Sequence, residues 1–179
     1  PVALALTALT MAAFAANSVL ARLALTTTAI DAGTFTAVRV VAGAVALLAL
    51  VGVRRQGVGG SWGSALALVA YAGFFSVAYL RLPTGAGALV LFGAVQLTMI
   101  GWGVARGERP SAPAWLGIAL AFGGLVALVA PGLTAPPLAP ALAMAASGAA
   151  WGAYSLRGRG SAAPTADTAG NFARAAPIA

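Results

Sequence analysis

The chain has 179 residues, of which 61% are hydrophobic and 7% are charged, and ten basic residues against three acidic ones give a formal net charge of +7. Soluble domains carry about 25% charged residues, so this composition excludes a water-soluble globular domain. The sequence has no Cys and no His, which excludes disulfides, thiolate and imidazole metal sites and His-based catalytic triads within it. The basic residues are all Arg and stand singly or in pairs between apolar runs. They form no basic face studded with aromatic residues, so the charge does not indicate nucleic-acid binding.

Long uncharged apolar runs follow one another along the chain. Backbone polar groups inside a bilayer need partners within the protein, which only helices and closed β-barrels provide. Barrel strands would alternate apolar and polar residues, whereas these runs are continuous and about as long as the ~20 residues of a membrane-spanning helix. We therefore predict an all-α, polytopic transmembrane helix bundle. The predicted spans are residues 1–21, 32–53, 62–80, 83–105, 114–130 and 141–156, and residues 168–179 begin a seventh helix.

Polar residues, Pro and Gly separate the predicted spans. Asp31 stands where the N-cap of the second helix belongs, and Pro83 falls in the first turn of the fourth, where its missing N–H costs no hydrogen bond. A secretory signal peptide is the alternative for the first run, but that run lacks a basic n-region and further spans follow it. The expected breaks are residues 22–31, 54–61, 81–82, 106–113, 131–140 and 157–167.

The distribution of Arg predicts the orientation in the membrane. The loops after the second, fourth and sixth spans hold six Arg residues, whereas the opposite side holds only Arg22 and Arg81. Because basic residues concentrate on the cytoplasmic side, we expect a cytoplasmic N-terminus and a multi-pass location in the cell inner (cytoplasmic) membrane. The six residues are Arg54, Arg55, Arg106, Arg109, Arg157 and Arg159.

Two pairs of Arg residues indicate an internal repeat. Arg22 and Arg39 are seventeen residues apart, and Arg157 and Arg174 have the same spacing 135 residues later. A chance match of two Arg residues is the alternative. A repeat unit of five spans is odd in number, so the second copy would enter the membrane from the opposite face, as in many secondary transporters. The predicted domains are a first five-helix repeat at residues 1–131, a linker at 132–140 and the incomplete start of a second repeat at 141–179.

The end of the predicted first repeat carries a family resemblance. Gly107-Glu108-Arg109-Pro110, followed by Trp115-Leu116-Gly117-Ile118 and Gly123-Gly124, resembles the end of an EamA domain, the repeat unit of the drug/metabolite transporter superfamily. The resemblance extends over essentially the whole chain, and its motifs are moderate in strength and not catalytic. It implies a ten-span transporter in two halves, of which this truncated sequence holds the first half and the start of the second.

The sequence and this resemblance together predict a secondary transporter that exports small organic metabolites or drugs by alternating access. A non-transporting integral membrane subunit, held together by small-residue packing, is the alternative. An enzyme is not expected, because the chain lacks His, Cys and paired intramembrane acids for general acid–base or metal chemistry. The expected partners are the lipid bilayer and a small-molecule substrate, without nucleic acid, cofactor or metal, and a homodimer is left open. No acidic residue lies in the first span, so the Glu-based proton antiport of distant relatives is unsupported here.

Five polar or aromatic residues are candidates for substrate binding. An intramembrane Arg such as Arg39 indicates a functional site facing a cavity, with snorkelling to the helix end as the alternative. Asn17 shares a helix face with Thr10, and Gln96 places an amide near the middle of the fourth span; interhelical hydrogen bonds are the alternative for all three. Tyr71 is an aromatic candidate for substrate contact. The alternative for the aromatic residues as a group is anchoring at the membrane interface. We expect Arg39, Asn17 and Gln96 to line one cavity.

Two pairs of glycines are expected to let helices approach closely. Gly117 and Gly124 are seven residues apart, and Gly148 and Gly152 form a Gly-x-x-x-Gly pattern. We also expect the first five spans to pack as one bundle. The sixth span and the helix after it should pack less densely, because their partners would lie in the second repeat.

Overall fold

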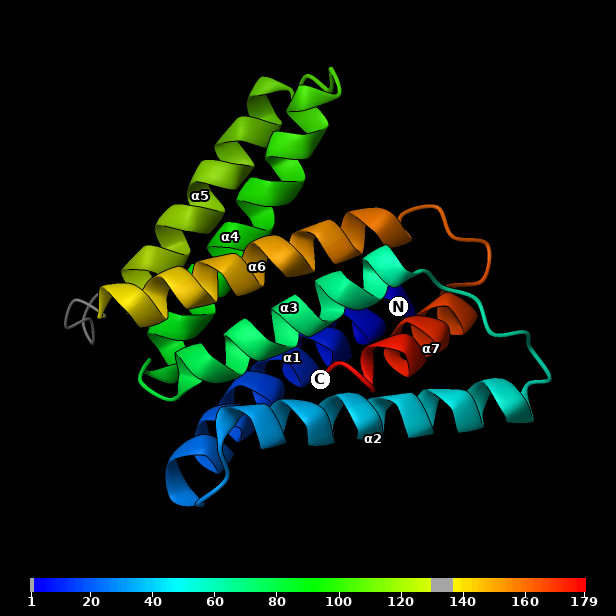
Figure 1. Cartoon of the computed structure of the whole chain (residues 1–179). Coiled ribbons are helices and arrows are strands. Elements are labelled where there is room, and N and C mark those ends of the chain that lie inside the picture. The colour runs from blue at the N-terminus through cyan, green and yellow to red at the C-terminus, as the bar shows by residue number, and fades with distance from the viewer. Residues whose placement is uncertain (1, 130–136) are drawn as a thin grey trace.

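The computed structural model describes residues 2–129 and 137–179, and over these residues the chain forms seven α-helices and no strand (Figure 1). The all-α prediction is therefore confirmed for the described part of the chain. The helices are α1 (Val2–Thr27), α2 (Ala32–Val53), α3 (Trp62–Tyr79), α4 (Thr84–Ala105), α5 (Ala112–Val129), α6 (Leu138–Gly158) and α7 (Pro164–Ala175).

Most predicted breaks separate the observed helices, but the first and last ones differ. Helix α1 continues past Arg22 to Thr27, because the hydroxyls of Thr27 and Thr28 donate to the carbonyls of Leu23 and Ala24, each at 2.7 Å. The hydroxyls of these threonines are therefore satisfied within the helix, so their polarity does not by itself end it. Helix α7 begins at residue 164 rather than 168, with Pro in its first turn. Most of the predicted linker at 132–140 lies outside the described residues.

Four of the described helices, α1 to α4, are long and apolar enough to cross a membrane. Helix α5 contributes a shorter apolar segment, Ala112–Gly124, and α6 does not reach the hydropathy of the other four. The chain is therefore a helical membrane protein with four candidate spans. Length and composition thus support the first four of the six predicted spans.

Helix α3 lies at the centre of the packed helices. Helix α6 runs along α3 and α4, and α7 packs on α2 and α3 (Figure 1). The core contains fully buried Phe75 and Tyr79 from α3 together with Met144 from α6. The expectation that α6 and α7 would pack loosely is wrong: both belong to the core, whereas most residues of α1 and α5 are exposed.

The close approach of α6 to α4 depends on two glycines. A Cβ atom at Gly148 would lie 2.5 Å from the Leu91 carbonyl oxygen and 2.7 Å from the Ala94 Cβ, and one at Gly152 would lie 2.9 Å from the Thr98 Cβ. Only glycine permits this backbone separation.

The other predicted glycine pair needs a correction. A Cβ at Gly117 or Gly124 would meet no described atom within 4 Å. Helix α5 turns a different face to α4, because the Phe122 ring lies beside Gly93 and both glycines lie on the far side of α5 from Phe122.

The predicted N-cap of α2 is present. One carboxylate oxygen of Asp31 accepts from the Thr34 backbone N–H at 2.9 Å, and the other accepts from the Thr34 hydroxyl at 2.5 Å. The hydroxyl bond, then the backbone bond, holds the pKa of Asp31 below its usual 3.8. The stabilisation by this cap is therefore present above the usual pKa and is lost as the pH falls through the lower, folded value.

We predict that Asp31→Ala frays the first turn of α2, because the Thr34 amide loses its acceptor. Amide hydrogen exchange at Thr34 should become faster, and Asp31→Asn, which keeps an acceptor oxygen, should retain most of the protection. Equal exchange in wild-type protein and Asp31→Ala would contradict the cap.

Candidate functional site

A polar pair joins α1 to α2 in the interior of the apolar segments. Arg39 extends from α2, two turns after its N-cap, and its Nη2 donates to Asn17 Oδ1 on α1 at 2.9 Å. Both side chains are half-buried. The structure thus brings together two of the residues that the sequence singled out.

Two aromatic rings flank the guanidinium of Arg39. Its Cζ lies 5.2 Å from the centroid of the Phe35 ring and 4.9 Å from that of Phe75. Phe35 is one helical turn before Arg39 on α2, and Phe75 comes from α3, where it is fully buried. The negative faces of aromatic rings attract a cation at this range, so the rings stabilise the charge in a poorly hydrated place.

The second terminal nitrogen of Arg39 has no acceptor. Nη1 is buried, and no described residue accepts a hydrogen bond from it. A buried donor without a partner costs about 1–3 kcal/mol, and more when it is charged. Native structures rarely retain such a group without a reason, and a ligand acceptor is one.

A groove of about 510 Å³ lies beside this pair, between the end of α1 and the start of α2. Its walls are mostly apolar. The Thr27 and Thr28 hydroxyls that reach it already donate within α1. Besides Arg39 and Asn17, the groove is lined by Leu20, Ala21, Leu23, Ala24, Thr27, Thr28 and Phe35.

Gln96 does not lie in this groove, which corrects the expected cavity of Arg39, Asn17 and Gln96. Helix α4 buries Leu91 and Val95, and Gln96 is exposed. Its amide lines other hollows, bounded in part by Ile100 and Ile118, away from Arg39. The packing of α6 on α4 determines which face of α4 is buried, and the sequence of α4 alone does not predict that face.

Thr10 and Tyr71 also lie outside the groove. Thr10 is exposed on α1, and its hydroxyl donates to the Leu6 carbonyl of the same helix at 2.8 Å. Tyr71 is buried in the core, where its ring centroid lies 4.7 Å from that of Trp151 and 5.5 Å from that of Phe75. Neither Thr10 nor Tyr71 therefore belongs to the candidate site.

Sequence reasoning missed the two rings beside Arg39. Phe35 had a usable signal, because a residue four positions before Arg39 on a helix lies on the same face. Phe75 had none, because its position depends on how α3 packs against α2. Its ring also stacks edge-to-face on Tyr79 at 4.7 Å, so the candidate site is supported directly by the core.

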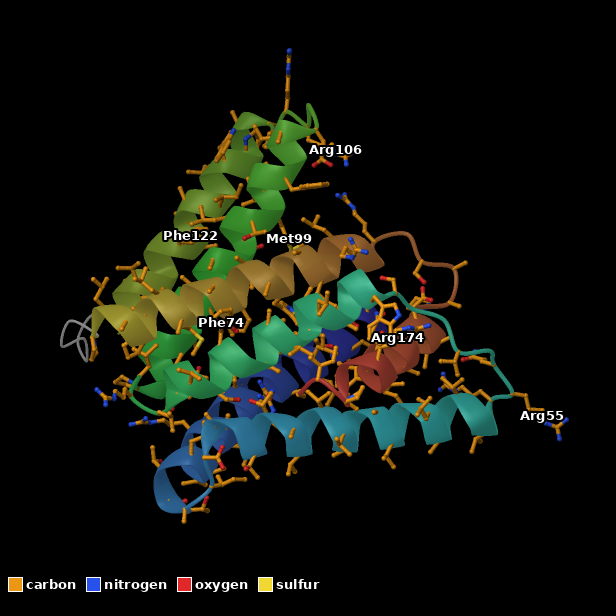
Figure 2. The ribbon with its side chains drawn as sticks, viewed as in Figure 1. Arg55, Phe74, Met99, Arg106, Phe122 and Arg174 are labelled. Atoms are coloured by element: carbon orange, nitrogen blue, oxygen red, sulfur yellow. The ribbon has the colours of Figure 1, made fainter. Side chains whose placement is uncertain are left out.

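A second polar cluster holds α7 to the loop between α2 and α3. Asp167 Oδ1 accepts from the Gly60 N–H at 2.9 Å, and Asn171 Oδ1 accepts from the Ser61 N–H at 2.8 Å. Arg174 Nη1 donates to the Gly59 carbonyl at 2.8 Å (Figure 2). We call these contacts of α7 with residues 59–61 the α7 latch. Arg174, which the predicted repeat pairs with Arg39, therefore has a different environment from Arg39.

Comparison with known proteins gives no function. No family model matches the chain, and no solved structure matches it. The chain is 52% identical over 179 residues to an uncharacterized protein of Pseudomonas aeruginosa, an alignment that covers 98% of this chain and 62% of that protein. The chain thus spans 62% of the length of the curated relative it matches.

Proposed function

We propose that this chain belongs to a secondary transporter of the EamA type, which exports small organic metabolites or drugs by alternating access. The observation that carries the proposal is Arg39, whose buried Nη1 finds no acceptor among the described residues and which lines a groove between two candidate membrane spans. Charged residues in such segments are costly and usually serve ion or substrate pathways. A purely structural subunit has no need of this charge.

The contacts of two other Arg residues support the inverted repeat within this proposal. Arg22, five residues before the end of α1, donates to the Tyr79 carbonyl at the C-terminal end of α3 at 2.6 Å. Its repeat counterpart Arg157 donates through Nε to Ser64 Oγ, near the N-terminal end of α3, at 3.1 Å. Equivalent residues of an inverted repeat belong on opposite faces of the membrane, and these two contacts lie at opposite ends of one helix.

The arrangement of the helix ends supports the proposed orientation. The C-terminal ends of α2 and α6 lie at one end of the helix layer, and the turn from α1 to α2 lies at the other (Figure 1). Arg55 projects from the first of these ends (Figure 2). With a cytoplasmic N-terminus, the α7 latch lies on the cytoplasmic side and the Arg39 groove towards the opposite face.

The proposal predicts that Arg39→Ala in the complete protein abolishes transport while leaving membrane insertion intact. Arg39→Lys should restore only part of the activity, because Lys lacks the planar fork and the close stacking of a guanidinium. The measurement is efflux of a substrate panel from cells or proteoliposomes. Arg81→Ala is the matched control, since Arg81 is exposed and outside the groove. Unchanged efflux in Arg39→Ala would contradict the proposal and favour the alternative that the Arg39 side chain snorkels to the helix end.

A further inference from the structure

We infer that the Arg39 groove binds the carboxylate of a small organic monoanion with an apolar body. This inference rests on the proposed function for its role in transport, but binding at the groove is a separate property. It follows from the sign of the charge, the number of free donors and the nature of the walls.

The sign of the charge excludes cations. Among the described residues, Arg39 is the only charged side chain that lines the groove. The three acidic residues of the chain lie elsewhere, at Asp31, Glu108 and Asp167. A cation in the groove would therefore meet the positive charge of Arg39 with no acidic side chain among the lining residues to offset the repulsion.

The number of free donors favours one carboxylate over a dianion. A guanidinium presents its N–H groups in a planar fork that fits the two oxygens of a carboxylate. Here Nη2 already donates to Asn17, and no residue in the described part of the chain accepts from Nη1. A carboxylate at this edge would give Nη1 its missing acceptor, whereas a phosphate dianion would lack partners for its remaining oxygens.

Phe35 is the less buried of the two rings beside the guanidinium. Nη1 is buried, so a ligand reaches it only after a side chain moves. Phe35 lines the groove and is half-buried, whereas Phe75 is locked in the core. Phe35 is therefore the ring with more room to move when a ligand approaches this edge from the groove.

The walls determine the rest of the ligand. Leucine, alanine and phenylalanine side chains line most of the groove, and the two threonine hydroxyls are already engaged within α1. Sugars and other polyhydroxylated molecules would lose hydrogen bonds to water without replacement. A volume of about 510 Å³ falls within the usual range for small-molecule sites.

The test uses the complete protein in detergent and three probes of matched shape: phenylacetate, neutral phenylacetamide and cationic 2-phenylethylamine. We expect phenylacetate to bind roughly tenfold or more tightly than the amide, as a charge-assisted hydrogen bond implies, and the amine not to bind. Inorganic phosphate should not compete. Titration calorimetry gives the affinities. Equal Arg39-dependent binding of the amide or the amine would overturn the inference.

Variants separate a binding role from a structural one. Arg39→Ala should lose phenylacetate binding, and exposed Arg81→Ala should retain it. Asn17→Asp places a carboxylate at the atom that now accepts from Nη2, so it should abolish phenylacetate binding without lowering thermal stability. Retained binding in Asn17→Asp would contradict the inference, because the internal carboxylate neutralises the guanidinium charge that the ligand carboxylate needs.

Transport assays distinguish the two proposals. If phenylacetate binds through Arg39 but proteoliposomes transport no member of a panel of anionic, neutral and cationic compounds, the proposed function is wrong and the site stands. If Arg39-dependent transport is found only for neutral or cationic substrates, the function stands and the carboxylate inference is wrong.

Discussion

Valine in place of Gly148 is expected to force α6 away from α4. A Cβ atom there would lie 2.5 Å from the Leu91 carbonyl oxygen and 3.2 Å from the Val95 backbone nitrogen. These are backbone atoms of a helix, which cannot move aside as the end of a flexible side chain can. Overpacking of this kind typically costs about 1–3 kcal/mol, and a β-branched side chain against backbone belongs at the upper end.

The matched control for Gly148→Val is Gly117→Val on α5. Its new side chain would meet no described atom within 4 Å, so the expected change is within about 0.5 kcal/mol. Thermal unfolding of both variants in the same detergent measures the difference. Equal stability of the two would mean that α6 and α4 are not in close contact in the folded protein.

Alanine in place of Gly170 is expected to open the α7 latch. The added Cβ would collide with the Gly59 carbonyl, which also accepts the hydrogen bond from Arg174. Displacement of α7 would then remove the acceptors of three consecutive amides. The N–H of Gly59 donates to the Ala166 carbonyl at 3.1 Å, and those of Gly60 and Ser61 donate to side chains of α7.

Amide hydrogen exchange measures this opening directly. Exchange at residues 59–61 should accelerate together in Gly170→Ala. It should not change in Gly158→Ala, because a Cβ at Gly158 meets no described atom within 4 Å. Unchanged protection in Gly170→Ala would show that α7 is held by other contacts.

Acid should open the same latch. A hydrogen bond from the Ser161 hydroxyl, followed by that from the Gly60 N–H, holds the pKa of Asp167 below its usual 3.8. The contribution of this carboxylate to docking is therefore present above pH 3.8 and is lost as the pH falls through the lower, folded pKa. Asp167→Asn should remove this pH dependence.

The helix ends were largely predictable because their signals are local. Asp31 caps α2, as the sequence indicated, and Pro83 is the N-cap of α4, one residue before the first turn in which the sequence placed it. The extension of α1 to Thr27 was missed, since threonine counts as polar although its hydroxyl bonds to its own helix.

The candidate site was only partly predictable. Asn17 and Arg39 were expected near one another and are hydrogen-bonded, but Gln96 lies elsewhere. The difference arises from Gly148 and Gly152, which determine how α4 and α6 meet and therefore which face of α4 turns outward. Which face of α4 turns outward depends on the packing of both helices, so it cannot be predicted from the residues of either helix alone.

The arginine contacts at the two ends of α3 mark the length of the membrane-spanning part of this helix. Helix α3 has 18 residues, so it spans about 27 Å at ~1.5 Å per residue. Arg22 holds one end and Arg157 the other, each with a charge that belongs in the headgroup region. The central helix thus matches a hydrocarbon core slightly thinner than the usual ~30 Å. A thicker bilayer would have to thin around this protein, which makes its stability sensitive to the acyl-chain length of the surrounding lipids.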